Sequence, residues 1–449
     1  MYLNDINDIF TDTKCNSPKL LHRLVPCLLY ADDLLILSES KSGLQHSLDI
    51  MQKYCTKWKL ELNVKKTKVM IFTTKVDRDE YKFHFGKDKL NVSDYCQYLG
   101  IQFSKNGTFK EAVNLLKEKG NKAMFLLKGS LYTGITFQPD LPLKIFDCTV
   151  RPILVYASEV WIHEYSKFLI KPQSLDKAPF ETINNKFCKS IMGLPRQASN
   201  FGVKADLGRK PIFSFICAQV IKYWYRIVNM NDDRLLKQAY LSEVELHNKG
   251  GHSWASFVAK ILEVINSVKL WHNQNSMVMD KQQIVRLKEL VSDSISKIYY
   301  EMEFNNITES SKLRTFAKFK FKMGMEKYVC ISDVPLSWRR QYCSFRISCH
   351  DLEIERGRYI RPRKPPEERI CKLCNIEPET ESHFLITCNT YANLRGNLYK
   401  NIIHMDPMFE VITDSHKFIY LMTSKNIDII KMVMQFIHCA MEVRKKSIK

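Results

Sequence analysis

Two short apolar runs around an acidic pair form the first clear pattern in the chain. Residues 24–37 read LVPCLLYADDLLIL. Short apolar runs of this kind, bounded by polar or turn-forming residues, are typical of buried strands. The pattern therefore predicts a hairpin of two buried strands with Asp32 and Asp33 at its apex.

The next apolar positions recur at helical spacing. Ser40 can cap a helix over residues 41–59, whose apolar face comprises Leu44, Leu48, Met51, Tyr54, Cys55 and Trp58. Strands are predicted over residues 60–72 and 98–104, the second ended by the pair Asn106 and Gly107. The order strand, strand, helix, strand, strand predicts an α+β fold.

After residue 107 the apolar spacing becomes helical almost throughout. Helices are predicted over residues 108–127, 143–159 and 180–192, and nearly everything from residue 212 to residue 304 reads as amphipathic helix. Near Arg356 the composition shifts to a short basic, proline-rich stretch, which predicts a linker before a small final unit. We therefore expect four regions, which comprise residues 1–106, 107–230, 231–350 and 351–449.

Composition narrows the class of protein. The 449 residues are 45% hydrophobic and 26% charged, so we expect several packed units and no wholesale disorder. A net charge of +20 predicts a polyanionic partner, either nucleic acid or an anionic membrane surface. No apolar run reaches spanning length, and the first residues lack a signal-type core. We expect a soluble intracellular protein, for which the nucleus and the cytoplasm both fit.

The chain contains 14 cysteines. Without a signal peptide, a chain of this length is expected to carry free thiols or metal ligands rather than a disulfide framework. Four single cysteines, namely Cys55, Cys96, Cys148 and Cys188, lie in apolar contexts and are predicted to be buried by packing. A group further along the chain has a different pattern.

That group has the spacing C-x2-C-x8-H-x4-C. Cys371 and Cys374 form a knuckle that can offer two thiolates to one metal, and His383 and Cys388 can complete a tetrahedron. Four nitrogen and sulfur ligands without an open position are typical of structural Zn²⁺. The alternative is a chance spacing of four unrelated side chains. Cys349 and His350 nearby are interpreted as structural residues and are left out of the ligand set.

The acidic pair has two readings. Hairpin turns favour Asn-Gly or Asp-Gly, and this one has no glycine. Adjacent like charges cost energy unless a cation neutralises them. Asp32 and Asp33 are therefore candidate ligands for divalent metal, of the kind used in two-metal phosphoryl transfer. The other reading is a solvated turn without chemistry.

The segment around this pair, Tyr30-Ala31-Asp32-Asp33, resembles the catalytic hairpin of reverse transcriptases. Asn63, Lys66 and Thr67 match the Asn-x-x-Lys-Thr core of the family's next motif, and residues 98–100 resemble its primer-grip strand. Later segments, residues 151–161, 190–195, 312–316 and 345–350, resemble those that follow the palm in LINE-type (non-LTR) retrotransposon enzymes, as does the Cys-Cys-His-Cys knuckle. The likeness extends over most of the chain.

The resemblance implies a partial palm over residues 1–106, a thumb-like helical region over 107–230, a helical connection over 231–350, and a basic linker with a zinc knuckle and C-terminal helices over 351–449. It implies RNA-directed DNA polymerisation on an RNA template with a DNA primer or target. Mg²⁺ would be held by Asp32 and Asp33, and Lys66 would lie near the triphosphate. Nucleic acid would contact the hairpin and the primer-grip strand, at Tyr30, Tyr98, Leu99 and Gly100.

Parts of the family's polymerase have no match in this sequence. The family's metal site needs a further acid on an earlier strand, and Asp5 and Asp8 are better read as helix or turn acids. With fingers and endonuclease also unmatched, we expect no polymerisation by this chain alone, and Lys66 then reads as a solvated lysine. The alternatives are a stand-alone zinc-dependent nucleic-acid-binding protein and a truncated reading frame without a role. The oligomeric state is not predicted.

The basic stretch before the knuckle is the second candidate contact with nucleic acid. Arg358, Arg361 and Arg363 suit bidentate binding of phosphate, and Tyr359 could stack on a base. A solvated linker is the alternative.

Overall fold

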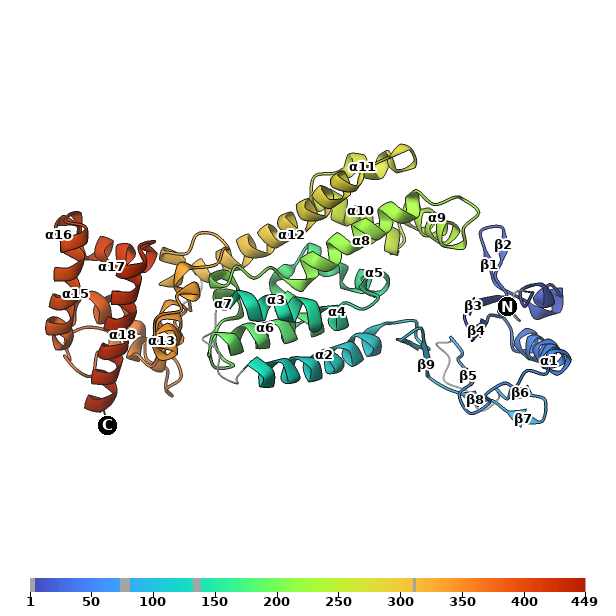
Figure 1. Ribbon diagram of the computed structural model, residues 1–449, viewed down its shortest axis with the longest axis horizontal. Coiled ribbons are helices and arrows are strands. Elements are labelled where there is room, and N and C mark those ends of the chain that lie inside the picture. The colour runs from blue at the N-terminus through green and yellow to red at the C-terminus, as the bar shows by residue number, and fades with distance from the viewer. Residues whose placement is uncertain (1–4, 73–80, 132–138, 310–311, 449) are drawn as a thin grey trace. The chain divides into compact units, whose positions relative to one another are not determined.

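The computed structural model describes residues 5–72, 81–131, 139–309 and 312–448. The chain folds into two compact units. Unit 1 comprises residues 1–116, 156–169 and 216–290, and unit 2 comprises residues 117–155, 170–215 and 291–449. Figure 1 labels their elements.

The N-terminal part of unit 1 contains the predicted hairpin and helix. The antiparallel strands β3 (Cys27–Tyr30) and β4 (Asp33–Ile36) form the hairpin, and α1 (Lys41–Trp58) follows. The Ser40 hydroxyl accepts the backbone N–H of Gly43, which is the predicted cap of α1. The apolar face of α1 packs with the start of the chain in one core, formed by Ile6, Phe10, Cys15, Cys27, Met51, Tyr54 and Cys55.

The hairpin and the helix are confirmed, but the predicted burial of both strands is wrong: Cys27 is buried, whereas burial decreases toward the turn and Tyr30 is exposed. Among the described strands β3 and β4 pair only with each other, so the hairpin is not enclosed by a larger sheet. Trp58, at the end of the predicted apolar face, is also exposed.

The remaining strands of unit 1 are short and lie in pairs. The described residues place β1 with β2, β5 with β8, β6 with β7 and β9 with β10. Of these described pairs, β5 with β8 is parallel and the others are antiparallel. Their bounds are β1 Lys19–Leu20, β2 Arg23–Leu24, β5 Lys68–Val69, β6 His84–Phe85, β7 Asp88–Lys89, β8 Asn91–Val92, β9 Tyr95–Tyr98 and β10 Ile101–Ser104.

The strand predicted over residues 60–72 is wrong for most of its length. Only Lys68–Val69 is strand, and the residues before it form a turn closed by Asn63. The Asn63 backbone oxygen accepts the N–H groups of Lys66 and Thr67, and its side-chain oxygen also accepts the Lys66 N–H. An Asn side chain competes in this way with ladder hydrogen bonds, so the apolar residues did not form a longer strand.

The strand predicted over residues 98–104 needs a second correction. Tyr98 ends β9, Leu99 and Gly100 form the turn, and β10 begins at Ile101. Leu99 has φ 47° and Gly100 has φ 80°. Two consecutive residues with positive φ are typical of tight hairpin turns, so the segment reverses direction where the sequence pattern suggested a continuous strand.

Helices make up the rest of both units. Three helices cross the unit boundary along the chain, namely α2 (Lys110–Leu131), α8 (Ile212–Val228) and α12 (Lys281–Glu309). The other helices of unit 1 are α5 Ser158–Trp161, α9 Leu235–Asn248, α10 Trp254–Val264 and α11 Val268–His272. The expected helical stretch from residue 212 to residue 304 is thus confirmed as a series of helices, whereas the predicted helix over residues 143–159 is divided. Pro152 lacks the N–H that a continuous helix needs there, and Ala157 has φ 50°.

Unit 2 is almost entirely helical. Its helices are α3 Asp140–Thr149, α4 Arg151–Leu154, α6 Pro179–Ile191, α7 Asn200–Asp206, α13 Leu336–Arg346, α14 Glu353–Arg356, α15 Ala392–Met405, α16 Met408–Val411, α17 Asp414–Thr423 and α18 Ile427–Ile448. A buried ion pair links α7 to α13, with the Arg346 Nε 2.8 Å from Asp206 Oδ2. The rings of Phe319, Tyr328 and Tyr342 surround the Arg346 guanidinium.

The single cysteines differ in their burial. Cys55 and Cys188 are buried, as predicted, and Cys96 is partly buried. Cys148 is exposed, so its predicted burial is wrong. It lies on the short helix α3, whose buried face carries Leu143 and Phe146 instead. No helix among the described residues is long and apolar enough to cross a membrane.

Candidate metal sites and nucleic-acid interface

The acidic hairpin presents both carboxylates to solvent. Tyr30 pairs with Asp33 across the strands, so Ala31 and Asp32 form a two-residue turn. Asp32, Asp33 and Tyr30 are exposed, Tyr30 by 64%. Ala31 holds φ at 54°, a left-handed conformation that is unfavourable for a residue with a Cβ. The backbone therefore holds two adjacent carboxylates accessible at the tip of a supported hairpin.

Tyr98 lies within electrostatic reach of this tip. Partial burial raises the pKa of the Tyr98 hydroxyl, and the negative charge of Asp33 raises it further. Among the described residues, Asp32 and Asp33 do not join a third Asp, Glu, His or Cys in a cluster able to hold one ion. Asp5 lies elsewhere, accepting the Tyr54 hydroxyl at 2.6 Å, and Asp8 begins a short 3-10 helix. The interpretation of both as turn or helix acids is therefore confirmed.

The other residues predicted around this site lie on turns. The Lys66 side chain is exposed, on the turn closed by Asn63. The Tyr156 hydroxyl donates a hydrogen bond to the Leu99 carbonyl oxygen, with 2.9 Å between the two oxygens. A Cβ on Gly100 would lie 3.2 Å from the Tyr156 ring, so this turn needs glycine both for its positive φ and for the close approach of the ring. Tyr156 was not identified from the sequence.

The four predicted zinc ligands come together in unit 2. One ligand atom from each of Cys371, Cys374, His383 and Cys388 lies within 4.8 Å of the others. The Cys374 Sγ is 3.3 Å from the His383 Nε2. In tetrahedral zinc sites with bonds of about 2.0–2.3 Å, neighbouring ligand atoms are roughly 3.5–3.8 Å apart. The donor set and its spacing therefore fit one tetrahedral ion.

Local backbone structure positions these ligands. The N–H of Asn375 donates to the Cys371 carbonyl at 2.9 Å, and Asn375 has φ 55°, which closes the knuckle. Burial raises the pKa of the Cys371 thiol to about 12. For Cys374 the effect of burial is outweighed by hydrogen bonds from the backbone of Ile376 and Glu377, so its pKa is lowered. The knuckle thus already supplies donors that stabilise one thiolate.

His383 has its other ring nitrogen occupied. Its Nδ1 is 3.0 Å from Glu377 Oε2 and 3.1 Å from Thr387 Oγ1. A carboxylate on the far nitrogen of a metal-binding histidine fixes the tautomer and the ring orientation. This leaves Nε2, the nitrogen beside Cys374, to act as the ligand. Glu377 was not identified from the sequence, because a glutamate between two ligand positions has no distinguishing pattern.

A buried ion pair and several hydrogen bonds hold the ligand loop against the rest of unit 2. The Arg444 guanidinium of α18 contacts both carboxylate oxygens of Glu379, at 2.6 and 2.7 Å. Arg395 of α15 donates through Nη2 to the Cys388 carbonyl at 2.5 Å. Glu381, two residues before His383, accepts hydrogen bonds from Thr315 and Ser348. Contacts from α15, from α18 and from Thr315 and Ser348 therefore hold the loop that carries the ligands.

The basic stretch before the knuckle is only partly free. Arg361, Arg363 and Tyr359 are exposed, Tyr359 by 72%. Arg358 differs, because its side chain is largely buried and its Nε lies 3.0 Å from Glu355 Oε2. Arg361 and Arg363 are thus available for phosphate contacts, whereas Arg358 is engaged within the fold.

Comparison with known proteins bears on this arrangement. The family described as reverse transcriptase (RNA-dependent DNA polymerase) matches residues 4–103, which include the acidic hairpin. The RNA-directed DNA polymerase from mobile element jockey of Drosophila funebris is 27% identical over 204 residues. These findings support the similarity of this chain to a non-LTR retrotransposon reverse transcriptase. The predicted resemblance to reverse transcriptases is confirmed for residues 4–103, and the likeness of the later segments and of the Cys/His knuckle stays a prediction.

The extent of these matches is limited. The jockey alignment covers 44% of this chain and 21% of the relative, so the chain spans about a fifth of the length of that reverse transcriptase. No solved structure matches the chain significantly. The family match covers the hairpin, Lys66 and the turn at Leu99, and it ends well before the Cys/His cluster.

Proposed function

We propose that this chain is a segment of a LINE-type RNA-directed DNA polymerase and that it binds RNA and DNA. The observation that carries the proposal is the reverse transcriptase match over residues 4–103, with Asp32 and Asp33 exposed at the tip of the matched hairpin. The net charge of +20 supports a polyanionic partner. Helices in residues 107–230 would form the thumb-like region, and those in 231–350 the connection.

Asp32 and Asp33 would hold Mg²⁺. Adjacent exposed carboxylates fit this ion, which is usually bound by one or two carboxylates together with substrate phosphates. Bound Mg²⁺ would activate the attacking hydroxyl and stabilise the leaving pyrophosphate. The chain's own part is to keep both carboxylates accessible beside Tyr98. Because no third acid joins the pair among the described residues, we expect this chain by itself not to polymerise.

Cys371, Cys374, His383 and Cys388 would hold a structural Zn²⁺. The donor set, its spacing and the Glu377 contact to His383 support this assignment. Zinc would stiffen the loop that follows Arg361 and Arg363, and so present the basic stretch to nucleic acid. Tyr30, Tyr98, Leu99 and Gly100 are proposed as further contacts, and Arg358 as a residue that supports its neighbours.

The binding part of the proposal can be tested by fluorescence anisotropy. The zinc-loaded protein is titrated into labelled single-stranded RNA at several salt concentrations. We expect affinity to fall as salt rises, because phosphate contacts release counterions. The variant His383→Ala should lose zinc, measured by atomic absorption, and bind RNA more weakly.

Cys148→Ser is the matched control, since Cys148 is an exposed cysteine outside the cluster. It should keep both zinc and affinity. RNA binding that does not depend on salt, or that is equal in His383→Ala and wild type, would contradict the proposal.

A second candidate is a stand-alone zinc-dependent nucleic-acid-binding protein without catalysis. The observation in its favour is that the Cys/His cluster brings all its ligands together, whereas the acidic pair lacks a third acid among the described residues. Both candidates bind RNA. They differ in whether Asp32 and Asp33 take part in templated synthesis when the remaining parts of a polymerase are supplied in trans.

A further inference from the structure

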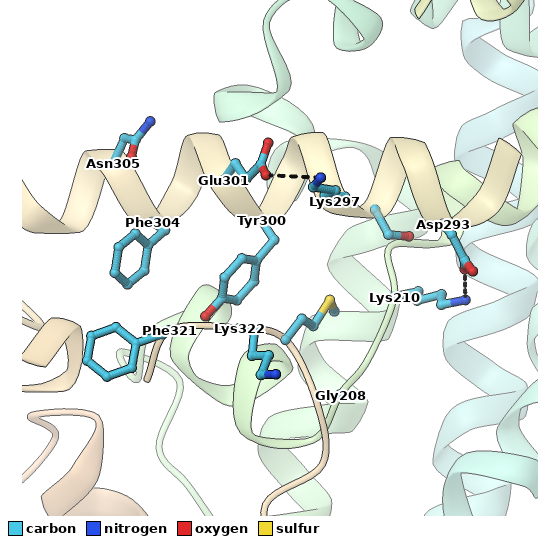
Figure 2. Close-up of a pocket in the computed structure, with 12 residues that line it drawn as sticks. Gly208, Lys210, Asp293, Lys297, Tyr300, Glu301, Phe304, Asn305, Phe321 and Lys322 are labelled. Atoms are coloured by element: carbon cyan, nitrogen blue, oxygen red, sulfur yellow. Dashed lines mark hydrogen bonds and ion pairs between the residues drawn. The ribbon is translucent and has the colours of Figure 1, made fainter. Parts of the chain in front are cut away.

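A cavity in unit 2, away from the metal ligands, combines aromatic rings with lysines. It has a volume of about 650 Å³, within the range of small-molecule binding sites. One wall is α12 and the opposite wall is the segment 321–323, with Gly208 and Lys210 at one end. Figure 2 shows the rings of Tyr300, Phe304 and Phe321 gathered below α12.

The aromatic rings of the cavity differ in their exposure to solvent. Tyr300 is buried, and its ring lies parallel to that of Phe304, with centroids 6.1 Å apart and an interplanar angle of 15°. Phe321 is 67% exposed. Exposing so much of a phenylalanine to water is unfavourable unless another surface covers it. The cavity thus has one wall with a buried aromatic ring, Tyr300, and one solvent-exposed ring, Phe321.

The cavity also contains an unsatisfied polar group. Ser296 of α12 lines the cavity and is only 4% exposed. Its hydroxyl finds no hydrogen-bond partner within the described part of the chain. A buried polar group without a partner costs free energy, so this hydroxyl indicates a ligand that carries a hydrogen-bonding group.

Two of the three lysines that line the cavity are paired with acids, which leaves Lys322 to contact an anionic group of a ligand. Lys210 is paired with Asp293, and Lys297 lies 3.7 Å from Glu301. The third lysine, Lys322, is exposed and follows Phe321 directly, within the sequence FAKFKFK at residues 316–322. An exposed aromatic ring beside an exposed cation suits a base joined to a phosphate.

The cavity walls are held in place. A Cβ on Gly208 would lie 2.7 Å from the Met325 backbone nitrogen, and Leu207 forms a β-bridge with Met325. The Glu326 N–H donates to the Asp206 carbonyl at 2.8 Å. The loop at Gly208 and the segment after Phe321 are thus joined through the backbone, so the cavity is formed before a ligand arrives.

We propose that this cavity binds one unstacked base of a single-stranded nucleic acid, with its phosphate at Lys322. The base would stack on Phe321 and Phe304 and accept or donate a hydrogen bond at the Ser296 hydroxyl. This inference deepens the proposed function and rests on it. It assigns a base-contacting role to the helical middle of the chain.

The experiment compares two single-stranded RNA probes of eight nucleotides, one of uridines and one with abasic residues, titrated into the zinc-loaded full chain. We expect Phe321→Ala to weaken binding of the uridine probe about tenfold and to leave binding of the abasic probe unchanged, because stacking needs a base. Phe321→Trp should restore affinity. Lys322→Ala should weaken both probes and reduce the salt dependence by about one counterion.

Ser296→Ala separates a binding role from a structural one. Removing an unpaired buried hydroxyl should leave thermal stability unchanged or raise it, while weakening binding of the uridine probe. Phe125→Ala is the matched control, since Phe125 is 61% exposed and lies beside Lys128, outside the cavity. It should bind both probes like the wild type.

Equal effects of Phe321→Ala on the two probes, or no effect on either, would overturn the inference while the proposed function stood. No effect on either would leave the cavity to an apolar partner such as a protein side chain. If the wild type bound neither probe, the proposed function would fail together with the inference.

Discussion

At the residue scale, the left-handed backbone at Ala31 decides how the two candidate metal ligands are presented. Alanine at φ 54° is strained by roughly 1–3 kcal/mol, and such strain persists where the surrounding structure over-determines it. The core under the hairpin, which includes Cys27 and Met51, supplies that support. A glycine at this turn would relieve the strain, but would also let the two carboxylates move.

Single residues also show what sequence could not predict. The spacing of Cys371 to Cys388 was readable because metal geometry restricts the distances between ligands along the chain. Glu377 and Tyr156 could not be predicted in this way. Glu377 acts through a contact with His383, and Tyr156 acts through a hydrogen bond to the Leu99 carbonyl. Such contacts are identified only in the three-dimensional structure. Ser296 likewise has no distinguishing sequence pattern, and only the structure shows that its buried hydroxyl has no hydrogen-bond partner among the described residues.

The contact between Glu377 and His383 leads to a prediction about metal affinity. Glu377→Gln keeps the size of the side chain but removes the charge that orients and polarises the imidazole. We expect zinc affinity to fall about 10–100-fold, measured by competition with a chromophoric chelator. Glu367→Gln, at an exposed glutamate before the knuckle, is the control and should bind zinc normally. An unchanged affinity in Glu377→Gln would remove Glu377 from the metal site.

At the element scale, helices with a clear cap and a clear apolar face were predictable. The helix α1 is an example, because the Ser40 cap and the buried face at Leu48, Met51 and Tyr54 agree. The strands were less predictable. Asn63 formed a turn within one apolar run, and the positive φ of Gly100 turned another into a hairpin. In both cases a local backbone preference prevailed over apolar alternation.

The attachment of α18 to the metal loop gives a prediction at this scale. Arg444→Met leaves the Glu379 carboxylate buried without its main partner. We expect the free energy of unfolding to fall by about 3–5 kcal/mol in urea titrations of the zinc-loaded protein. Adding Glu379→Gln should recover part of the loss, because the uncompensated charge is then gone. A loss below about 1 kcal/mol in Arg444→Met would mean that the pair does not hold the helix.

At the scale of the whole molecule, the family likeness was predictable from the sequence, whereas the division of the chain into units was not. The motif order predicted a likeness to reverse transcriptases, and the family match over residues 4–103 agrees, whereas the charge of +20 left nucleic acid and an anionic membrane surface both open. The division into two units, each built from segments distant in sequence, was not apparent from the order of helices. Discontinuous units depend on long-range packing, which apolar periodicity does not report.

The proposed function places Mg²⁺ at Asp32 and Asp33, which no third acid joins among the described residues. Primer extension tests it most directly, with purified zinc-loaded protein, an annealed RNA template and DNA primer, deoxynucleotides and Mg²⁺. We expect the protein to bind the annealed substrate and to add no nucleotides above the level of Asp32→Ala. Templated incorporation by the wild type that Asp32→Ala abolishes would contradict the account.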